Sequence, residues 1–261
     1  MPSIDSSRLE RQVDELKDLV SDPTALRRQV MDMFDYYADR TRRPNSRGKG
    51  DDGPWVYGVP GPVYRSLSRA LEAELRSHPE WTVPAAEALW QAGYRETQYL
   101  AASIMGGLGE ETVPMMVEAF ALAGRDPIAT ETLADKGLRK WRKVDPLAFR
   151  SWAGDLVRSD RSRLKSLGFL SLLAAVRDPE FEYLPETFRL LSGQMGEVRG
   201  EARRSLRSLL SGLAIRSPRE TTAFLENEIE RGTAGAGRMT RNIMKHMPPR
   251  QQDTLKTALA G

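Results

Sequence analysis

The sequence contains no cysteine and only two histidines, His78 and His246, which are far apart along the chain. The absence of cysteine excludes disulfide-stapled scaffolds, cysteine-ligated zinc and iron–sulfur sites, and catalysis by a thiol nucleophile. Two histidines that are far apart in sequence argue against an imidazole metal site and against a Ser-His-Asp triad. We therefore expect an intracellular protein that holds no metal and needs no cofactor.

Membrane and nucleotide-binding signatures are also absent from the sequence. No run approaches the roughly 18 uncharged apolar residues that suggest a membrane span, and residues Met1–Val20 are charged throughout, unlike a signal peptide. The chain has no Gly-x-x-x-x-Gly-Lys run, no Gly-x-Ser-x-Gly elbow and no dinucleotide fingerprint. The sequence thus predicts a cytoplasmic protein, associated with the nucleoid when it is bound to DNA.

Charge is distributed unevenly along the chain. The 39 Lys and Arg residues nearly balance the 36 Asp and Glu residues, for a formal net charge of +3. However, Ser66–Asp135 carries 4 basic and 11 acidic residues, whereas Lys136–Lys165 carries 10 basic and 3 acidic ones. Arg199–Arg216 adds 5 arginines against one glutamate. Arginine concentrated in two segments favours a surface that follows phosphates, and solvated helix faces are the alternative.

Apolar residues recur at helical spacing along most of the chain, and we find no convincing alternating strand. Residues Ser3–Leu19 and Pro23–Tyr37 are predicted to form two amphipathic N-terminal helices. A small polar residue followed by proline is typical of a helix start. Five such junctions divide the chain into short helices: Asp22-Pro23, Asp126-Pro127, Asp145-Pro146, Asp178-Pro179 and Ser217-Pro218.

The predicted helices pair as hairpins that repeat along the chain. The first helices of successive pairs begin near Arg95, Pro127, Arg161, Arg199 and Gly235, at intervals of 32, 34, 38 and 36 residues. A period in the thirties without strands predicts an all-α, HEAT-like helical-repeat solenoid with a concave surface. We expect a monomer with a single domain over residues 1–261, divided into N-terminal helices (1–41), a loop (42–56) and helical repeats (57–261).

The segment Arg42–Pro54 is polar and rich in glycine and proline, which predicts a loop. A basic loop of this kind can clamp a nucleic-acid backbone. A plain surface linker is the alternative, and the sequence does not distinguish the two.

Two stretches of the sequence resemble a known family. Tyr57–Leu67 reads Tyr-Gly-Val-Pro-Gly-Pro-Val-Tyr-Arg-Ser-Leu, and Leu89–Ala101 contains Gly-Tyr-Arg-Glu-Thr-Gln-Tyr-Leu-Ala. Both stretches resemble the DNA alkylation repair family of AlkD-like glycosylases, and the similarity extends from about Tyr57 to about Met247. The resemblance implies an all-helical HEAT-like fold. It also implies removal of cationic alkylated purines, such as 3-methyladenine and 7-methylguanine, from duplex DNA held in a concave basic groove.

The resemblance further implies a catalytic aspartate, a tryptophan four residues before it and an arginine on the next repeat. The run Glu131–Lys136 resembles the family's Asp-Thr-Leu-Ala-x-Lys, so Glu131 stands at the aspartate position. Pro127 then stands at the tryptophan position and Ser166 at the arginine position. Glu131 keeps a carboxylate and is our catalytic candidate. The alternative is that Glu131 stabilises a helix N-terminus.

Similar substitutions follow farther along the chain. Arg204 falls where the family has a lysine, and Ser208 and Ser211 fall where it commonly has tryptophan and arginine. Basic residues are nevertheless retained around the substituted positions. Because a phosphate contact needs charge more than identity, DNA binding should tolerate these changes better than catalysis. The seven predicted DNA-binding residues are Arg158, Arg161, Arg163, Lys165, Arg203, Arg204 and Arg207.

The sequence therefore predicts a protein that binds double-stranded DNA, alkylated or not, and whose excision activity is weak, altered in substrate or lost. Two alternatives remain open. One is an active alkylpurine glycosylase that uses Glu131. The other is a noncatalytic scaffold that binds a protein partner on its concave face.

Overall fold

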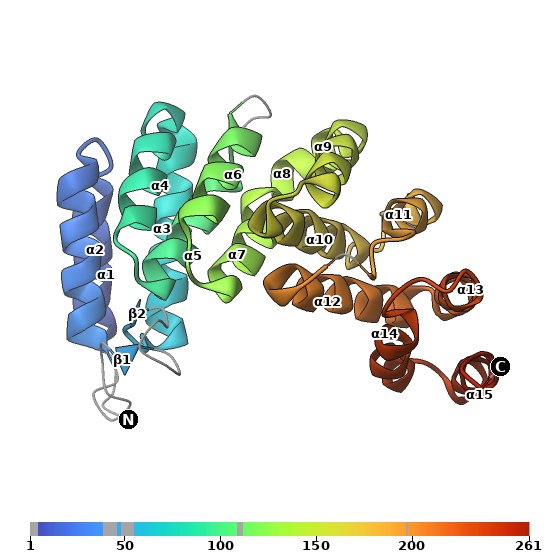
Figure 1. Cartoon of the computed structure of the whole chain (residues 1–261). Helices are drawn as coiled ribbons and strands as arrows, with labels where there is room; N and C mark the ends of the chain where they lie inside the picture. Colours follow the sequence, from blue (N-terminus) through green and yellow to red (C-terminus); the bar gives the residue numbers. More distant parts are fainter. Residues whose placement is uncertain (1–4, 39–45, 48–54, 109–111, 197, 261) are drawn as a thin grey trace. The chain divides into compact units, whose positions relative to one another are not determined.

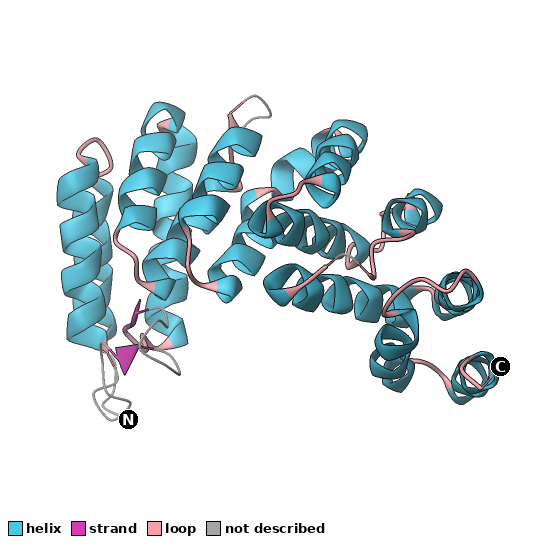
Figure 2. Cartoon of the chain, in the orientation of Figure 1, coloured by secondary structure: helices cyan, strands magenta, loops and turns pink. Residues whose placement is uncertain are grey.

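The computed structural model describes residues 5–38, 46–47, 55–108, 112–196 and 198–260. Over these residues the chain is almost entirely helical, as predicted, with one short pair of strands (Figures 1 and 2). Its contacts divide it into two compact units, Met1–Val144 (unit 1) and Asp145–Gly261 (unit 2). A single domain over residues 1–261 stays a prediction.

Unit 1 is built of helices that pack on one another in chain order. α1 packs on α3, α3 on α5 and α5 on α7, while α2 and α5 both pack on α4. A π-helical segment, Leu133–Gly137, joins α7 to α8, and a 3-10 turn, Pro79–Trp81, precedes α4. The helices are α1 (Ser6–Lys17), α2 (Pro23–Tyr37), α3 (Gly61–Ser77), α4 (Thr82–Gln91), α5 (Arg95–Met105), α6 (Val113–Ala123), α7 (Pro127–Thr132) and α8 (Arg139–Val144).

The two strands of unit 1 lie within the predicted loop at residues 42–56. β1 (Ser46–Arg47) pairs antiparallel with β2 (Trp55–Val56). Strands of two residues are too short to show an alternating pattern, so the sequence contains no sign of this pair. The rest of Arg42–Pro54 lies outside the described residues, and so does its predicted contact with DNA.

Unit 2 has a nearly fully buried helix at its centre. α10 packs against α9 and α12, and its residues from Ser166 to Val176 are all buried. A Cβ atom on Gly168 would lie 2.9 Å from the carbonyl oxygen of Ala153, so glycine allows α9 and α10 to approach closely. The helices are α9 (Pro146–Arg158), α10 (Ser162–Val176), α11 (Leu184–Leu191), α12 (Gly200–Arg216), α13 (Pro218–Glu230), α14 (Ala236–Ile243) and α15 (Pro249–Ala258), and a 3-10 turn, Met244–His246, follows α14.

The predicted starts of the repeated helices are confirmed. Arg95 and Pro127 are the first residues of α5 and α7. The other three predicted starts are N-cap residues: Arg161 for α10, Arg199 for α12 and Gly235 for α14. Helix positions along the chain thus follow the period that the sequence predicts.

Four of the five predicted junctions also begin a helix. Asp22, Asp126 and Asp145 accept hydrogen bonds from backbone N–H groups in the first turns of α2, α7 and α9, and Ser217 is the N-cap residue of α13. The fifth junction, Asp178-Pro179, begins no helix.

The chain turns at Asp178-Pro179 because an arginine binds its carbonyl groups. Arg216 of α12 donates hydrogen bonds to the carbonyl oxygens of Asp178, Pro179 and Phe181, at 3.0, 2.7 and 3.4 Å. These carbonyls therefore face a guanidinium group, and the next helix, α11, starts only at Leu184. A short-range sequence pattern could not reveal a partner 38 residues away.

Side-chain hydrogen bonds connect segments that lie about one predicted repeat apart. Glu96 binds the N–H of Tyr57, 39 residues earlier in the chain. In unit 2, Ser205 pairs with Ser166 across 39 residues, and Glu228 with Ser192 across 36. These bonds join alternate helices or the segments beside them, such as α10 with α12.

None of the described helices has both the length and the apolar character that crossing a bilayer requires.

Candidate nucleic-acid interface

Glu131 lies near the C-terminal end of α7 and is half-buried. The cap of α7 is Asp126, whose Oδ1 accepts a hydrogen bond of 3.0 Å from the N–H of Ile128. The first turn of α7 contains no acidic residue. The alternative that Glu131 stabilises the N-terminus of a helix is therefore wrong, because Glu131 is the last residue but one of α7. Pro127, at the predicted tryptophan position, is the exposed first residue of α7.

A buried ion pair fixes the start of α7 against α5. Nε of Arg95 lies 2.6 Å from Oδ2 of Asp126, and Nη2 of Arg95 lies 3.3 Å from Oδ1. Asp126 is only 2% exposed. Its hydrogen bond raises the pKa of Arg95, so the guanidinium stays charged. Two parallel hydrogen bonds between a guanidinium and a carboxylate group fix the orientation of α5 relative to α7.

Tyr99 of α5 lies near this ion pair. Burial raises the pKa of Tyr99, while the nearby Arg95 acts in the opposite direction. The Arg95–Asp126 pair thus holds the start of α7, and the half-buried carboxylate of Glu131 lies near the other end of the same short helix. Such a carboxylate can stabilise positive charge on a reacting sugar.

Three further polar side chains meet beside α5, and we call them the Tyr64 cluster: Tyr64, Ser103 and Lys136. The Tyr64 hydroxyl lies 3.4 Å from Oγ of Ser103, and Nζ of Lys136 donates to the same Oγ at 3.4 Å. Nζ of Lys136 also lies 5.7 Å from the centre of the Tyr64 ring, within the range of a cation–π contact. Lys136 belongs to the π-helical segment Leu133–Gly137, and such segments are frequent at functional sites.

Sequence reasoning did not select the Tyr64 cluster. Tyr64 and Lys136 both lie in the runs that carry the family resemblance, so the resemblance could have singled out these two residues. Ser103 lies outside these runs, and nothing in the sequence distinguishes a small, buried residue near the C-terminal end of α5.

Ser166 does not reach solvent. It is 0% exposed, and its Oγ lies 2.7 Å from Oγ of Ser205 on α12. The side chain at the predicted arginine position therefore faces the packing between α10 and α12. An arginine there would have to bury its charge between two helices.

Three predicted DNA-binding residues lie at the N-terminus of α10. Arg161 is its N-cap residue, Arg163 is exposed in its first turn, and Lys165 is half-buried with Nζ 3.3 Å from Oε1 of Gln194. The first turn of α10 contains no acidic residue. Cations oppose the positive end of a helix dipole, so these side chains do not help α10 to form. Together with the helix terminus they attract anions.

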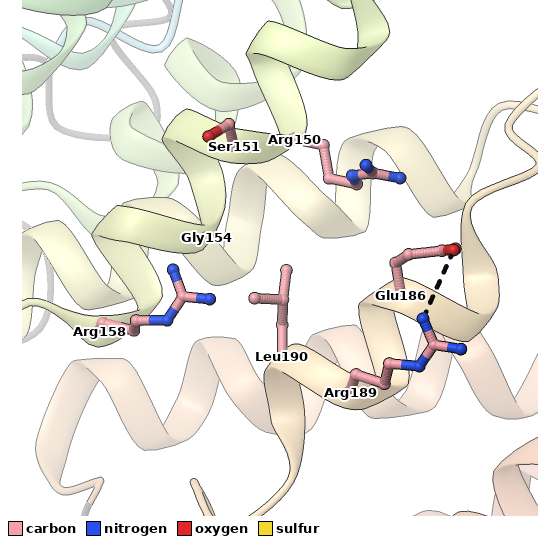
Figure 3. A pocket seen from close by; sticks show the side chains of 7 residues that line it. All are labelled: Arg150, Ser151, Gly154, Arg158, Glu186, Arg189 and Leu190. Carbon is pink, nitrogen blue, oxygen red and sulfur yellow. Dashed lines mark ion pairs between the residues drawn. The ribbon is translucent and has the colours of Figure 1, made fainter.

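Arg158, the last residue of α9, lines a pocket of about 330 Å³ between α9 and α11 (Figure 3). Arg150 and Arg189 line the same pocket. Arg158 pairs with Asp155 at 3.2 Å and Arg189 with Glu186 at 3.7 Å. Carboxylates thus already neutralise two of these three arginines in part.

The remaining predicted residues lie on α12. Arg204 and Arg207 are exposed, whereas Arg203 is half-buried. Arg207 lines a different pocket from Arg158, together with Ser208 and Ser211. Unit 2 therefore distributes the seven predicted residues over the end of α9, the start of α10 and the first half of α12. Their contact with DNA stays a prediction.

No group of three or more His, Asp or Glu side chains that could hold a metal ion occurs within the described part of the chain.

Comparison with known protein families assigns the chain to one of them. A family model described as DNA alkylation repair enzyme matches residues 30–246. The match starts inside α2, earlier than the resemblance found in the sequence, and ends in the turn after α14. No curated protein and no solved structure matches the chain.

Proposed function

The chain belongs to the DNA alkylation repair enzyme family, and from this we propose that it binds duplex DNA, alkylated or not, as part of alkylation repair. The observation that carries the proposal is the family match, which spans residues 30–246 and so includes most of both units. The confirmed helix starts agree with a helical-repeat solenoid, which we include in the proposal together with its concave basic groove.

The charges of unit 2 support duplex DNA as the ligand. The start of α10 combines Arg161 and Arg163 with the N-H groups of a helix terminus. Arg204 and Arg207 add exposed cations on α12, which packs against α10. Phosphate groups gain from both sources of positive potential, and every phosphate neutralised releases counterions.

We propose further that excision of alkylated bases is weak, altered in substrate or lost. Pro127 offers no indole to pack against a lesion. Ser166 is enclosed between α10 and α12, so its side chain cannot hold a phosphate as an arginine would. Glu131 is longer than aspartate by one methylene group, and a displacement of about 1 Å can cost about 100-fold in a positioned reaction.

A second candidate function is active excision that uses Glu131. The half-buried carboxylate of Glu131, on a helix whose start is fixed by the Arg95–Asp126 ion pair, favours this candidate. In this reading the carboxylate stabilises the oxocarbenium character of the sugar while the cationic base departs.

One experiment tests both proposals. The protein, in excess over methylated duplex DNA, is assayed in a single turnover for released 3-methyladenine and 7-methylguanine, and duplex binding is measured in parallel by fluorescence anisotropy. Duplex binding is expected for the wild type, and its absence would contradict the main proposal.

The variant Glu131→Gln separates the two candidates. If Glu131 is catalytic, the variant loses base release by at least about 100-fold and keeps its affinity for DNA. Glu118→Gln, a change at another glutamate of unit 1, is the matched control. Base release that is equal in Glu131→Gln and in the wild type would rule out Glu131 as the catalytic group.

Two further points belong to the proposal. We propose that the protein acts as a monomer, because solenoids of this kind bury their core between successive repeats. We also propose that it works in the cytoplasm, on the nucleoid. Recovery of one protein partner without nucleic acid in a pull-down would instead favour the scaffold alternative.

A further inference from the structure

A second pocket of unit 2, of about 790 Å³, lies between α10, α12 and the end of α14, and we call it the α12 pocket. Its volume falls in the usual range for sites that bind small molecules. It is separate from the pocket that contains Arg158, because the two share no lining residue. The residues that decide its chemistry are Arg177, Arg207, Ser208, Ser211, Ile215 and Lys245.

The α12 pocket is lined by cations. Arg177, Arg207 and Lys245 are exposed at its surface, and Arg216 and His246 also line it. Among the described residues that line it there is no aspartate or glutamate. Arg216 already donates hydrogen bonds to carbonyl oxygens of the turn after α10. Arg207 and Lys245, from α12 and the turn after α14, therefore present positive charge that no lining carboxylate offsets, which indicates an anionic ligand.

Small side chains leave the α12 pocket open along α12. Ser208 is exposed, and Ser211 donates its hydroxyl proton back to the carbonyl oxygen of Arg207 at 2.9 Å. A Cβ atom on Gly212 would lie 2.7 Å from Cδ1 of Leu173, so glycine lets α12 approach α10 here. The open space thus follows from three small residues at helical spacing on α12, Ser208, Ser211 and Gly212.

Apolar surface lies directly beside these cations. Ile215 of α12 lines the pocket and is 70% exposed, whereas Leu173 and Val176 of α10, which also line it, are buried. A free inorganic anion would gain nothing from such a surface. A ligand with a phosphate at one end and a flat, weakly polar ring system at the other would use both halves, because ring burial adds to phosphate pairing.

We propose that the α12 pocket binds a nucleoside 5′-phosphate unit, with the phosphate against Arg207 and Lys245 and the base against Ile215. The unit is either a free mononucleotide or the phosphorylated nucleotide at the 5′ end of a DNA strand. Nucleotides are the phosphate esters that a member of a DNA repair family meets. The proposal rests on the proposed function in one respect, because Arg207 lines the pocket and also belongs to the predicted duplex-binding residues; no residue of the α10 N-terminus lines the pocket.

Isothermal titration calorimetry of the full chain tests the pocket. The probes are deoxyadenosine 5′-monophosphate, deoxyadenosine and inorganic phosphate, at fixed ionic strength. We expect one nucleotide per chain, bound at least ten-fold more tightly than either deoxyadenosine or phosphate alone. Equal binding of phosphate and nucleotide, or no binding of the nucleotide at millimolar concentration, would overturn the proposal.

Three variants locate the nucleotide in the structure. Ser208→Trp fills the pocket from α12 and should weaken nucleotide binding at least ten-fold, and Lys245→Ala should weaken it about five-fold or more by removing one phosphate contact. The control Arg241→Ala removes an exposed arginine of α14 that does not line the pocket, and should change the affinity less than two-fold. Unchanged affinity in Ser208→Trp, with its melting temperature preserved, refutes the assignment.

A competition experiment then identifies the source of the nucleotide. A single strand carrying a 5′-phosphate and the same strand ending in a hydroxyl are added to the nucleotide complex. Displacement by the phosphorylated strand alone assigns the pocket to a strand end. Displacement by neither strand assigns it to a free mononucleotide. Displacement by both to the same extent contradicts a site that reads the 5′-phosphate.

Discussion

At the scale of single residues, the hydroxyl of Tyr64 is enclosed between α3, α5 and the π-helical segment. Burial raises its pKa to about 12, and hydrogen bonds with Ser103 and Ser68 only partly oppose this effect. At neutral pH the phenol is therefore fully protonated and able to donate a hydrogen bond. Because Lys136 approaches the same serine, the Tyr64 cluster combines a cation with a neutral donor.

This environment predicts a loss of stability in alkali. The pKa of tyrosine is about 10 in the unfolded chain and about 12 for Tyr64 in the folded chain. Between these values the folded state binds more protons, so the free energy of unfolding falls as the pH rises from 10 to 12 and is unaffected below pH 10. Tyr64→Phe should remove a contribution of about 2 to 3 kcal/mol from this fall.

Urea denaturation at pH 9 and pH 11 provides the measurement for Tyr64. The difference in unfolding free energy between the two pH values should be smaller in Tyr64→Phe than in the wild type. Tyr36→Phe, a change at a half-exposed tyrosine of α2, is the control. The same pH dependence in Tyr64→Phe and in the wild type would show that Tyr64 does not titrate as described.

At this scale, the sequence predicted where a functional residue lies along the chain better than which residues its side chain contacts. It placed Glu131, Pro127 and Ser166 along the chain and predicted Asp126 as the cap before Pro127, but it could not show that Asp126 also pairs with Arg95, 31 residues earlier. The Tyr64 cluster joins residues 33 and 39 positions apart. A single sequence shows spacing within a helix, whereas such pairs form only once the helices are packed.

At the scale of secondary-structure elements, α10 and α12 are held by close packing with little room for larger groups. The Ser166–Ser205 hydrogen bond is buried in their contact, and the two hydroxyls satisfy each other. Restoring the family's arginine at this position would therefore not restore its function.

The prediction is that Ser166→Arg destabilises the protein by about 3 kcal/mol or more, because a long charged side chain enters a filled contact. Thermal unfolding followed by circular dichroism measures this effect. Ser162→Arg introduces the same side chain at an exposed position of α10 and should change the unfolding free energy by less than about 0.5 kcal/mol. Equal stability of the two variants would show that Ser166 is not enclosed.

The elements themselves were largely predictable. Proline after a capping residue marked four helix starts because both the cap and the first turn are local. The fifth predicted helix start, Asp178-Pro179, was wrong. The carbonyl oxygens of Asp178 and Pro179 accept hydrogen bonds from Arg216. The pair β1 and β2 was missed because two residues on each strand are too few for an alternating pattern.

At the scale of the whole molecule, positive charge is concentrated in unit 2. Residues 145–261 contain 19 basic and 14 acidic side chains, whereas residues 1–144 contain 20 and 22. A duplex that binds through the predicted residues of unit 2 would release several counterions. The affinity should then depend steeply on salt.

We expect duplex affinity to fall by at least about 100-fold between 50 and 200 mM salt. Arg161→Ala and Arg163→Ala should each lower the slope of log affinity against log salt by about one. Arg219→Ala, at an exposed position of α13 outside the predicted set, should leave the slope unchanged. Fluorescence anisotropy at several salt concentrations measures these slopes, and a flat dependence in the wild type would exclude binding through phosphates.

The hydrogen bonds between neighbouring repeats also bear on how the chain folds. Glu96 with Tyr57, and Glu228 with Ser192, join groups 39 and 36 residues apart in a chain of 261. The entropy cost of closing a loop rises by only about 0.6 kcal/mol for each doubling of its length, so these contacts cost less than contacts between the two ends of a unit would. Under the proposed solenoid, each unit nucleates at any adjacent pair of helices and grows helix by helix, without waiting for its two ends to meet.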